Sequence, residues 1–442
     1  MKIQLSDHFT YKKLLGFTLP SIIMMIFTSI YGVIDGFFVS NFVGKTPFAA
    51  VNFIMPFLMI LGAFGFMFGT GGSALIAKTL GEGNAEKANR IFSLLIYTSL
   101  ISGAVIAILG IIFIRPIAQL LGATGTMLDD CVTYGRIILA ALPAFMLQYE
   151  FQSFFVTAEK PQLGLFVTVA AGVTNMVLDA LLVAVIPIGL VGAALATAIS
   201  QCVGGIVPLL YFARSNRGLL HLGKTSFDGH VLLKTCTNGS SELMSNISMS
   251  IVSMLYNVQL LRYEGEDGIA AYGVLMYVNM IFLAAFIGYA VGTAPVIGYH
   301  FGAENHRELK SLLKKSFVII GFFSISMLIA GEALAYPLSL LFVSYDQALL
   351  ELTLRGFLIY SFSFLFAGIA IYGSSFFTAL SDGLTSALIS FLRTLVFQIV
   401  AVLVFPLIWQ TDGIWLSIVA AELMATLTTL LFLWLKRKKY HY

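Results

Sequence analysis

Residues 91–114 read IFSLLIYTSLISGAVIAILGIIFI, an apolar stretch of 24 residues without a charged side chain. An α-helix rises about 1.5 Å per residue, and roughly 20 apolar residues are enough to cross the hydrocarbon core of a bilayer. The stretch therefore predicts a transmembrane helix.

Polar breaks separate twelve such apolar runs along the chain. We expect helices near residues 14–39, 49–77, 91–114, 131–157, 162–186, 190–213, 238–261, 269–299, 316–343, 350–377, 384–408 and 413–435. A β-barrel would need alternating segments of about ten residues, and these runs are longer and uniformly apolar. The predicted fold class is an all-α polytopic membrane protein with 12 transmembrane helices. The first run leads directly into further runs, so we expect a membrane span there and not a cleaved signal.

The composition of the 442 residues agrees with this class. Hydrophobic residues make up 59% of the chain and charged residues only 11%, with a mean hydropathy of +0.93. Soluble domains carry about a quarter charged residues, so a water-soluble enzyme is excluded. The net charge of +3 is too small to indicate a nucleic-acid partner. The three cysteines lack C-x-x-C spacing, which argues against a disulfide framework or a zinc site.

The distribution of Lys and Arg predicts the orientation of the chain. Alternate polar segments, counted from the N-terminus and including Lys2, hold 19 of the 25 basic residues. The opposite segments hold three. Basic loops stay on the cytoplasmic side of a membrane. We therefore expect a protein of the plasma (inner) membrane with both termini in the cytoplasm.

The two halves of the chain repeat each other at an offset of 221 residues. Turn residues keep this register, including the pairs Gly44 and Gly265, Pro116 and Pro337, and Gly192 and Gly413. A repeat of six spans predicts two six-helix bundles related by a pseudo-two-fold axis along the membrane normal, with a substrate path between them. We expect residues 1–213 and 235–442 to form the bundles and residues 214–234 to be a cytoplasmic linker.

Polar side chains in the spans of the first half predict an ion site. A charged side chain at the centre of a transmembrane helix costs about 2.5–3.5 kcal/mol. Acidic residues within the spans are therefore candidates for a functional role. Helical rise places five oxygen-bearing side chains at a similar depth in the outer half of the first bundle: Asp35, Tyr134, Asn175, Asp179 and Thr197.

The second half lacks this set, because Tyr256, Val396 and Val400 stand at the positions that correspond to Asp35, Asn175 and Asp179. This asymmetry favours a coupling site in the first bundle. Two carboxylates can share a proton, and the oxygens of Asp35, Asn175 and Asp179 could instead bind Na⁺. The alternative is that the acids only join helices through hydrogen bonds.

Other residues are candidates for contact with a substrate. Glu150 and Glu242 lie in the inner halves of their spans, where they could attract a cation or pair with Arg393. Flexible thioethers can form a wall that adapts to flat apolar cations. The candidates are Met25, Met55, Met59, Met276 and Met280. The alternative is that these methionines pack helices or face lipid, and that Glu332 and Glu422 line a cavity or join helices.

Several segments resemble the multidrug and toxic compound extrusion (MATE) transporters of prokaryotic type, within the MOP flippase superfamily. The similar segments are Leu19-Pro20 with residues 31–39, the loops 81–84 and 302–305, and residues 174–179 followed by 192–197. The chain departs from the family pattern at residues 157–161. The resemblance implies two six-helix bundles around a V-shaped cavity and export of organic cations driven by H⁺ or Na⁺. It would make Asp35, Asn175 and Asp179 the coupling residues, with Tyr134 and Thr197 beside them.

We therefore expect a secondary active antiporter for small lipophilic cations, working by alternating access as a monomer in membrane lipid. It would need no cofactor besides the coupling ion, H⁺ or Na⁺. The alternative is a flippase for lipid-linked oligosaccharides or cell-wall lipids. Such a protein should line its cleft with several basic residues to meet pyrophosphate, and only Arg136, Arg355 and Arg393 lie in spans. An integral membrane enzyme is disfavoured because no H-E-x-x-H motif occurs.

Overall fold

The computed structural model describes residues 3–214 and 218–442, and this part of the chain is helical without a strand. Lys2 and the predicted linker residues 215–217 lie outside it. The predicted all-α fold class is confirmed.

The first half of the chain forms seven α-helices, two of which continue as π-helical turns. They are α1 (Tyr11–Phe38) with η1 (Val39–Val43), α2 (Lys45–Gly81), α3 (Ala85–Leu121), α4 (Gly125–Ala140), α5 (Leu142–Thr157), α6 (Pro161–Asp179) with η2 (Ala180–Val185), and α7 (Leu190–Ala213).

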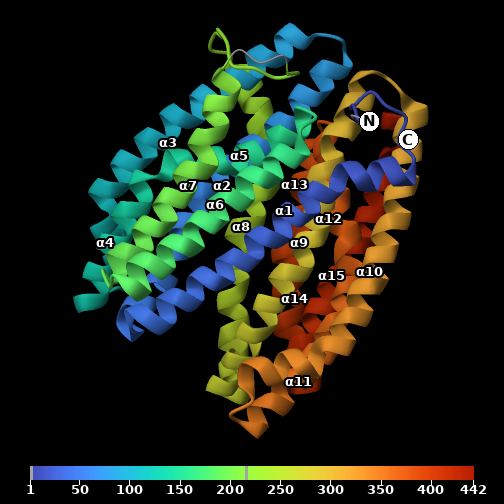
Figure 1. Cartoon of the computed structure of the whole chain (residues 1–442). Helices are drawn as coiled ribbons and strands as arrows, with labels where there is room; N and C mark the ends of the chain where they lie inside the picture. The colour runs from blue at the N-terminus through green and yellow to red at the C-terminus, as the bar shows by residue number, and fades with distance from the viewer. Residues whose placement is uncertain (1–2, 215–217) are drawn as a thin grey trace.

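The second half repeats this order with more interruptions. It contains α8 (Gly229–Glu264), α9 (Glu266–Gly302), α10 (His306–Val343), α11 (Gln347–Tyr360), η3 (Ser361–Ser363), α12 (Phe364–Ala379), α13 (Gly383–Phe391), η4 (Leu392–Val396), α14 (Phe397–Val404) and α15 (Pro406–Tyr440). Figure 1 shows the blue-to-green helices and the yellow-to-red helices as two groups side by side, with both termini near the same end.

Ten helical segments in the described residues are long and apolar enough to cross a membrane, and the bent pair of α4 and α5 makes an eleventh. The remaining segment is α8, whose 36 residues are long enough to cross. Its inner part, TCTNGSSELMSNISMS at residues 235–250, is rich in polar side chains. This polarity makes α8 less apolar than the other membrane-spanning helices.

One predicted span is interrupted by a bend. The fourth span was predicted as one helix, but it breaks at Ala141 with a bend of 57°. Pro143 follows the break, and proline has no N–H for the carbonyl one turn earlier. The break between the last two spans falls at Gln410, between the predicted limits 408 and 413, where a φ of 54° interrupts α15. The twelfth span therefore begins after Gln410.

The bundles meet at the end of the molecule that carries both termini. A Cβ on Gly81 of α2 would lie 2.0 Å from the carbonyl oxygen of Tyr299, and a Cβ on Gly302 of α9 would lie 2.0 Å from that of Lys78. Both residues of one contact are 221 positions from those of the other, so the sequence repeat appears as a two-fold relationship in space. Only glycine lets the backbones of α2 and α9 approach this closely.

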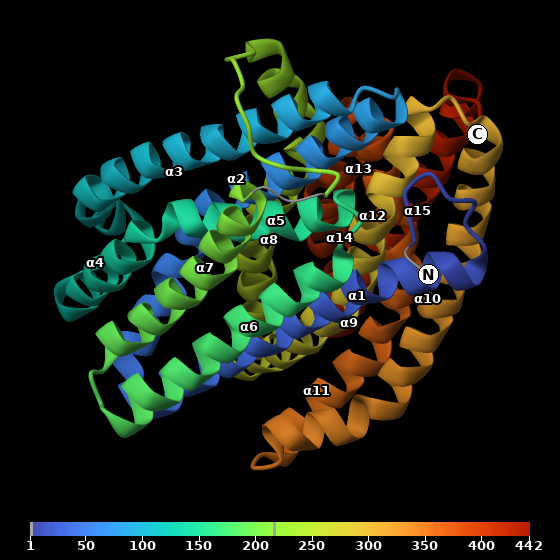
Figure 2. The same cartoon turned by 45° about the horizontal axis from the view of Figure 1, so that its top comes forward.

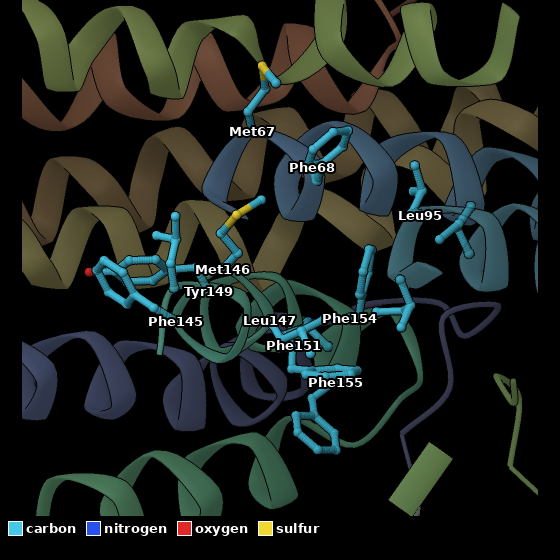
Figure 3. Close-up of a cluster of buried hydrophobic side chains, with 14 of the residues drawn as sticks. Met67, Phe68, Leu95, Phe145, Met146, Leu147, Tyr149, Phe151, Phe154 and Phe155 are labelled. Carbon is cyan, nitrogen blue, oxygen red and sulfur yellow. The ribbon is translucent and has the colours of Figure 1, made fainter. Parts of the chain in front are cut away.

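The core of the first bundle surrounds α5, on which every residue except Pro143 is buried. Figure 3 shows Phe145, Met146, Tyr149, Phe154 and Phe155 of this helix packed with neighbouring apolar side chains. Polar groups on α5 are therefore enclosed by protein. In Figure 2, α6 lies beside α1, and these two helices carry the acidic residues of the candidate site.

Candidate ion-binding site

Three helices bring polar side chains of the first bundle together. Asp35 of α1 interacts with Asp179 and Asn175 of α6 and with Thr197 of α7. The hydroxyl of Thr197 donates to Asp35 Oδ1 over 3.4 Å and also lies 3.2 Å from the carbonyl oxygen of Ala193 on its own helix.

A change of helix type follows each acidic residue. The N–H of Val39 bonds to the carbonyl oxygens of both Asp35 and Gly36, where α1 widens into η1. Asp179 is the last residue of α6 before it widens into η2. Such π-helical turns occur often at functional sites, because the extra residue changes the direction of the neighbouring side chains.

The side-chain oxygens of α6 at the site are buried without hydrogen-bond donors. Asp179 is fully buried, and Asn175 is 2% exposed. Within the described residues, no donor forms a hydrogen bond with either carboxylate oxygen of Asp179 or with the amide oxygen of Asn175. A buried acceptor that lacks a donor is destabilising, so these oxygens need a proton or a cation.

The donor set fits a small hard ion. Carboxylate, amide and hydroxyl oxygens are the ligands that such cations prefer, and two ionised carboxylates in contact would repel each other. No group of three or more His, Cys, Asp or Glu residues that could hold a metal ion occurs in the described part of the chain. Two acids and neutral oxygens can hold a proton or a small hard cation such as Na⁺.

Tyr134 of α4 is 1% exposed and contacts Thr197. The sequence also contains two residues at this site that we did not predict. Tyr31 lies one turn before Asp35 on α1 and interacts with Gln148 of α5. The spacing of four residues from Asp35 was a signal for Tyr31, because such residues share a helix face. For Gln148 the sequence offered no signal.

The second bundle contains a different polar cluster. The hydroxyl of Tyr256, at the position that corresponds to Asp35, donates to Gln398 Oε1 over 2.7 Å. Arg393 donates two hydrogen bonds of 2.8 and 2.9 Å to Glu422, and both side chains are largely buried. Glu242 interacts electrostatically with Arg393, but the ion-pair partner of Arg393 is Glu422.

The structure does not bring Glu150 and Glu242 together. Glu150 is fully buried on α5 and accepts a hydrogen bond from Ser99 of α3. Glu242 is half-buried on α8. Glu332 accepts a hydrogen bond from Ser361, so it joins α10 to η3. A substrate role for Glu150 and Glu242 remains a prediction.

The five methionines do not form one group. Met25 is buried where α1 meets α9, in a cluster with Ala284. Met55, Met59 and Met276 are half-buried. Met280 is 42% exposed, and its carbonyl oxygen lies 3.4 Å from the Ser29 hydroxyl. Their contact with a substrate remains a prediction.

Known proteins are similar to this chain in sequence and in fold. The chain is 27% identical over 365 residues to the multidrug export protein MepA of Staphylococcus haemolyticus, with 81% of this chain and 80% of that protein covered. It is 25% identical over 436 residues to MepA of Staphylococcus saprophyticus, with 97% and 94% covered.

A solved structure described as the outward-facing conformation of a multidrug resistance MATE family transporter of the MOP superfamily matches with a TM-score of 0.93. Its sequence is 22% identical, and the match covers 98% of this chain and 97% of that one. This likeness supports the predicted fold of twelve transmembrane helices in two bundles.

The MatE family model matches residues 20–181 and 243–404, once in each half. The two matches cover most of the sequence and follow its internal repeat. The chain belongs to the MatE family.

Proposed function

We propose that this protein is a secondary active multidrug exporter that extrudes organic cations in exchange for H⁺ or Na⁺. The observation that carries the proposal is the contact between Asp35 and Asp179 in a buried site whose oxygens lack donors. Membership in the MatE family and similarity to relatives named multidrug export proteins support the same function.

The position of α1 explains how an ion in the site could move the bundles. Asp35 lies near one end of α1, and the other end packs against α9 of the second bundle. A Cβ on Gly288 would lie 2.5 Å from Ile22 Cα, and one on Gly292 would lie 3.0 Å from Thr18. One helix therefore connects the ion site to the contact between the bundles. An ion that changes the packing of α1 would shift the equilibrium between the two arrangements of the bundles.

The conformation suits the ion-loading step. The bundles are joined at the end with both termini, which the basic loops place in the cytoplasm. The site would then be reached from outside, where H⁺ or Na⁺ enters and a bound drug leaves. Rocking of the bundles would open the cytoplasmic end, release the ion and admit a new substrate.

Substrate contacts follow from the same arrangement. Glu242 would supply a half-buried acid for a cationic substrate, and Met55, Met59, Met276 and Met280 would supply adaptable apolar contacts. Glu150 is sealed in its bundle, so its contact with a drug would need a change of conformation. The exporter would work as a monomer in the plasma membrane, with both termini cytoplasmic and no cofactor besides the coupling ion.

Transport of a pyrophosphate-linked lipid fits less well. Arg393 is paired with Glu422, and Arg355 is paired with Asp412. Each guanidinium that could meet a diphosphate in the second bundle already has a carboxylate partner. The acids of the first bundle would repel such an anion.

Efflux of ethidium from proteoliposomes, with imposed H⁺ and Na⁺ gradients tested separately, tests the proposal. We expect Asp35→Asn and Asp179→Asn each to abolish gradient-driven efflux. Glu332→Gln is the matched control, because it removes an intramembrane acid that is bonded to Ser361 away from the site. Wild-type efflux by both aspartate variants would overturn the assignment.

A further inference from the structure

A groove opens on the outer side of the first bundle. It has a volume of about 450 Å³, between the bend of α4 and α5 on one side and α7 on the other. Its lining includes Arg136, Ile137, Ala140, Leu195, Ala198 and Ile199. A volume of this size accommodates a small ligand or a segment of an acyl chain.

The groove lies on the back of the helices that form the ion site. Tyr134 of α4 interacts with Thr197 of α7, and the Thr197 hydroxyl donates to Asp35. Arg136 and Ile199 come two residues later on the same helices, roughly 200° around the helix axis. Both are exposed. The groove therefore opens away from the site, toward the lipid around the bundle.

Arg136 has no side-chain partner among the residues that the structure describes. In the described residues it makes no ion pair or side-chain hydrogen bond, and no acidic side chain lines the groove. Arg355 offers a comparison, because it lies on α11, the first helix of the bent span in the other bundle. It donates to Asp412 through Nε over 2.8 Å and through Nη2 over 2.5 Å.

The depth of Arg136 points to a partner at the membrane surface. Asp129 of α4 pairs with Arg115, an exposed ion pair near the end of the span. Arg136 follows Asp129 by seven residues, which is about 10 Å farther along the helix. A long arginine side chain reaches back over part of that distance toward the headgroups. An unpaired guanidinium at this depth favours an anion from outside the chain.

We propose that this groove binds one anionic phospholipid of the outer leaflet, with its phosphate on Arg136 and an acyl chain along Ala140 and Ala198. The planar guanidinium matches the oxygens of a phosphate. The 57° bend of the fourth span and the small alanine side chains make room for the chain. A zwitterionic headgroup would bring an ammonium for which the groove has no acid.

Native mass spectrometry of the purified protein, titrated with phosphatidylglycerol or with phosphatidylcholine, tests this. We expect the wild type to retain one phosphatidylglycerol more tightly than any phosphatidylcholine. Arg136→Gln should weaken that binding at least about tenfold by removing a charge-assisted contact. Ala198→Phe should weaken it by filling the groove, so the proposal stays testable if one variant does not fold. Arg355→Gln is the matched control and should bind as the wild type does.

Equal binding of the two lipids by the wild type would overturn the proposal. The same holds if Arg136→Gln or Ala198→Phe keeps the wild-type affinity for phosphatidylglycerol. The assignment of the lipid to the outer leaflet rests on the proposed orientation of the protein. Lipid retention itself is measured without transport. A failure here therefore leaves the exporter proposal standing, and a failure of efflux leaves the lipid site standing.

Discussion

The carboxylate of Asp35 on α1 interacts with that of Asp179 on α6, and neither oxygen of Asp179 has a hydrogen-bond donor in the described chain. Two acids in this relationship are stable together only when a proton or a cation reduces their repulsion. The ion occupancy of this pair is therefore the property that the following predictions address.

Thr197→Val should weaken ion coupling without abolishing it. The hydroxyl of Thr197 donates to Asp35, and hydrogen bonds to charged groups contribute about 1.5–3 kcal/mol. We expect the concentration of driving ion for half-maximal efflux to change by roughly tenfold, because 1.4 kcal/mol corresponds to a factor of ten. Thr174→Val is the control, since Thr174 bonds only to Ala170 of its own helix. Equal changes in the two variants would contradict a role for Thr197 at the site.

Gly81→Ala and Gly302→Ala should each destabilise the contact between the bundles at the end that carries both termini, and to a similar extent. A new Cβ would lie 2.0 Å from a backbone oxygen of the other bundle in both cases, so α2 and α9 must separate. Overpacking of this kind costs about 1–3 kcal/mol. Distances between spin labels on the two bundles at this end should lengthen in both variants. Gly273→Ala on α9 has open space around its Cβ and should leave them unchanged.

Glu308→Ala should lower the melting temperature in detergent. Glu308 of α10 is 5% exposed and accepts from the N–H of Phe9 over 2.9 Å, and its other oxygen lies 2.6 Å from His8 Nδ1. The change leaves the buried Phe9 N–H without its acceptor, a penalty of about 1–3 kcal/mol. Glu86→Ala is the control, because Glu86 stands in the first turn of α3 and its partner Arg90 is solvent-exposed. Equal melting temperatures of the two variants would show that the contact of the N-terminal segment with Glu308 does not stabilise the protein.

Asp382 should make stability depend on pH. Burial of Asp382 raises its pKa, but hydrogen bonds from Tyr440 and Thr385 and the charge of Lys436 outweigh burial and hold the pKa below its ordinary value. A lowered pKa in the folded state stabilises the protein above the ordinary value, near pH 4, and this stabilisation is lost as the pH falls through the lowered value. Asp382→Asn should therefore melt earlier than the wild type at pH 7. The difference should shrink below about pH 4, and a difference that is constant down to pH 3 would argue against this linkage.

The sequence predicted the spans and the meeting of Asp35, Asn175, Asp179 and Thr197, because span length and helical rise fix the depth of a residue. Depth does not fix which side of an apolar helix faces which neighbour. The partner of Arg393 illustrates this limit. Glu242 was a plausible partner by depth, but the rotation of α15 presents Glu422 with better geometry. The contact of Tyr31 with Gln148 depends on how α1 and α5 pack across the bundle, which no local pattern encodes.

Drug-evoked ion release from the purified protein tests the role of the Asp35–Asp179 pair most directly. Ethidium is added to protein in a weakly buffered solution, and the H⁺ and Na⁺ that appear are measured. We predict that the wild type and Glu332→Gln release an ion when ethidium binds, whereas Asp179→Asn binds ethidium and releases none. Release by Asp179→Asn equal to that of the wild type would contradict the account.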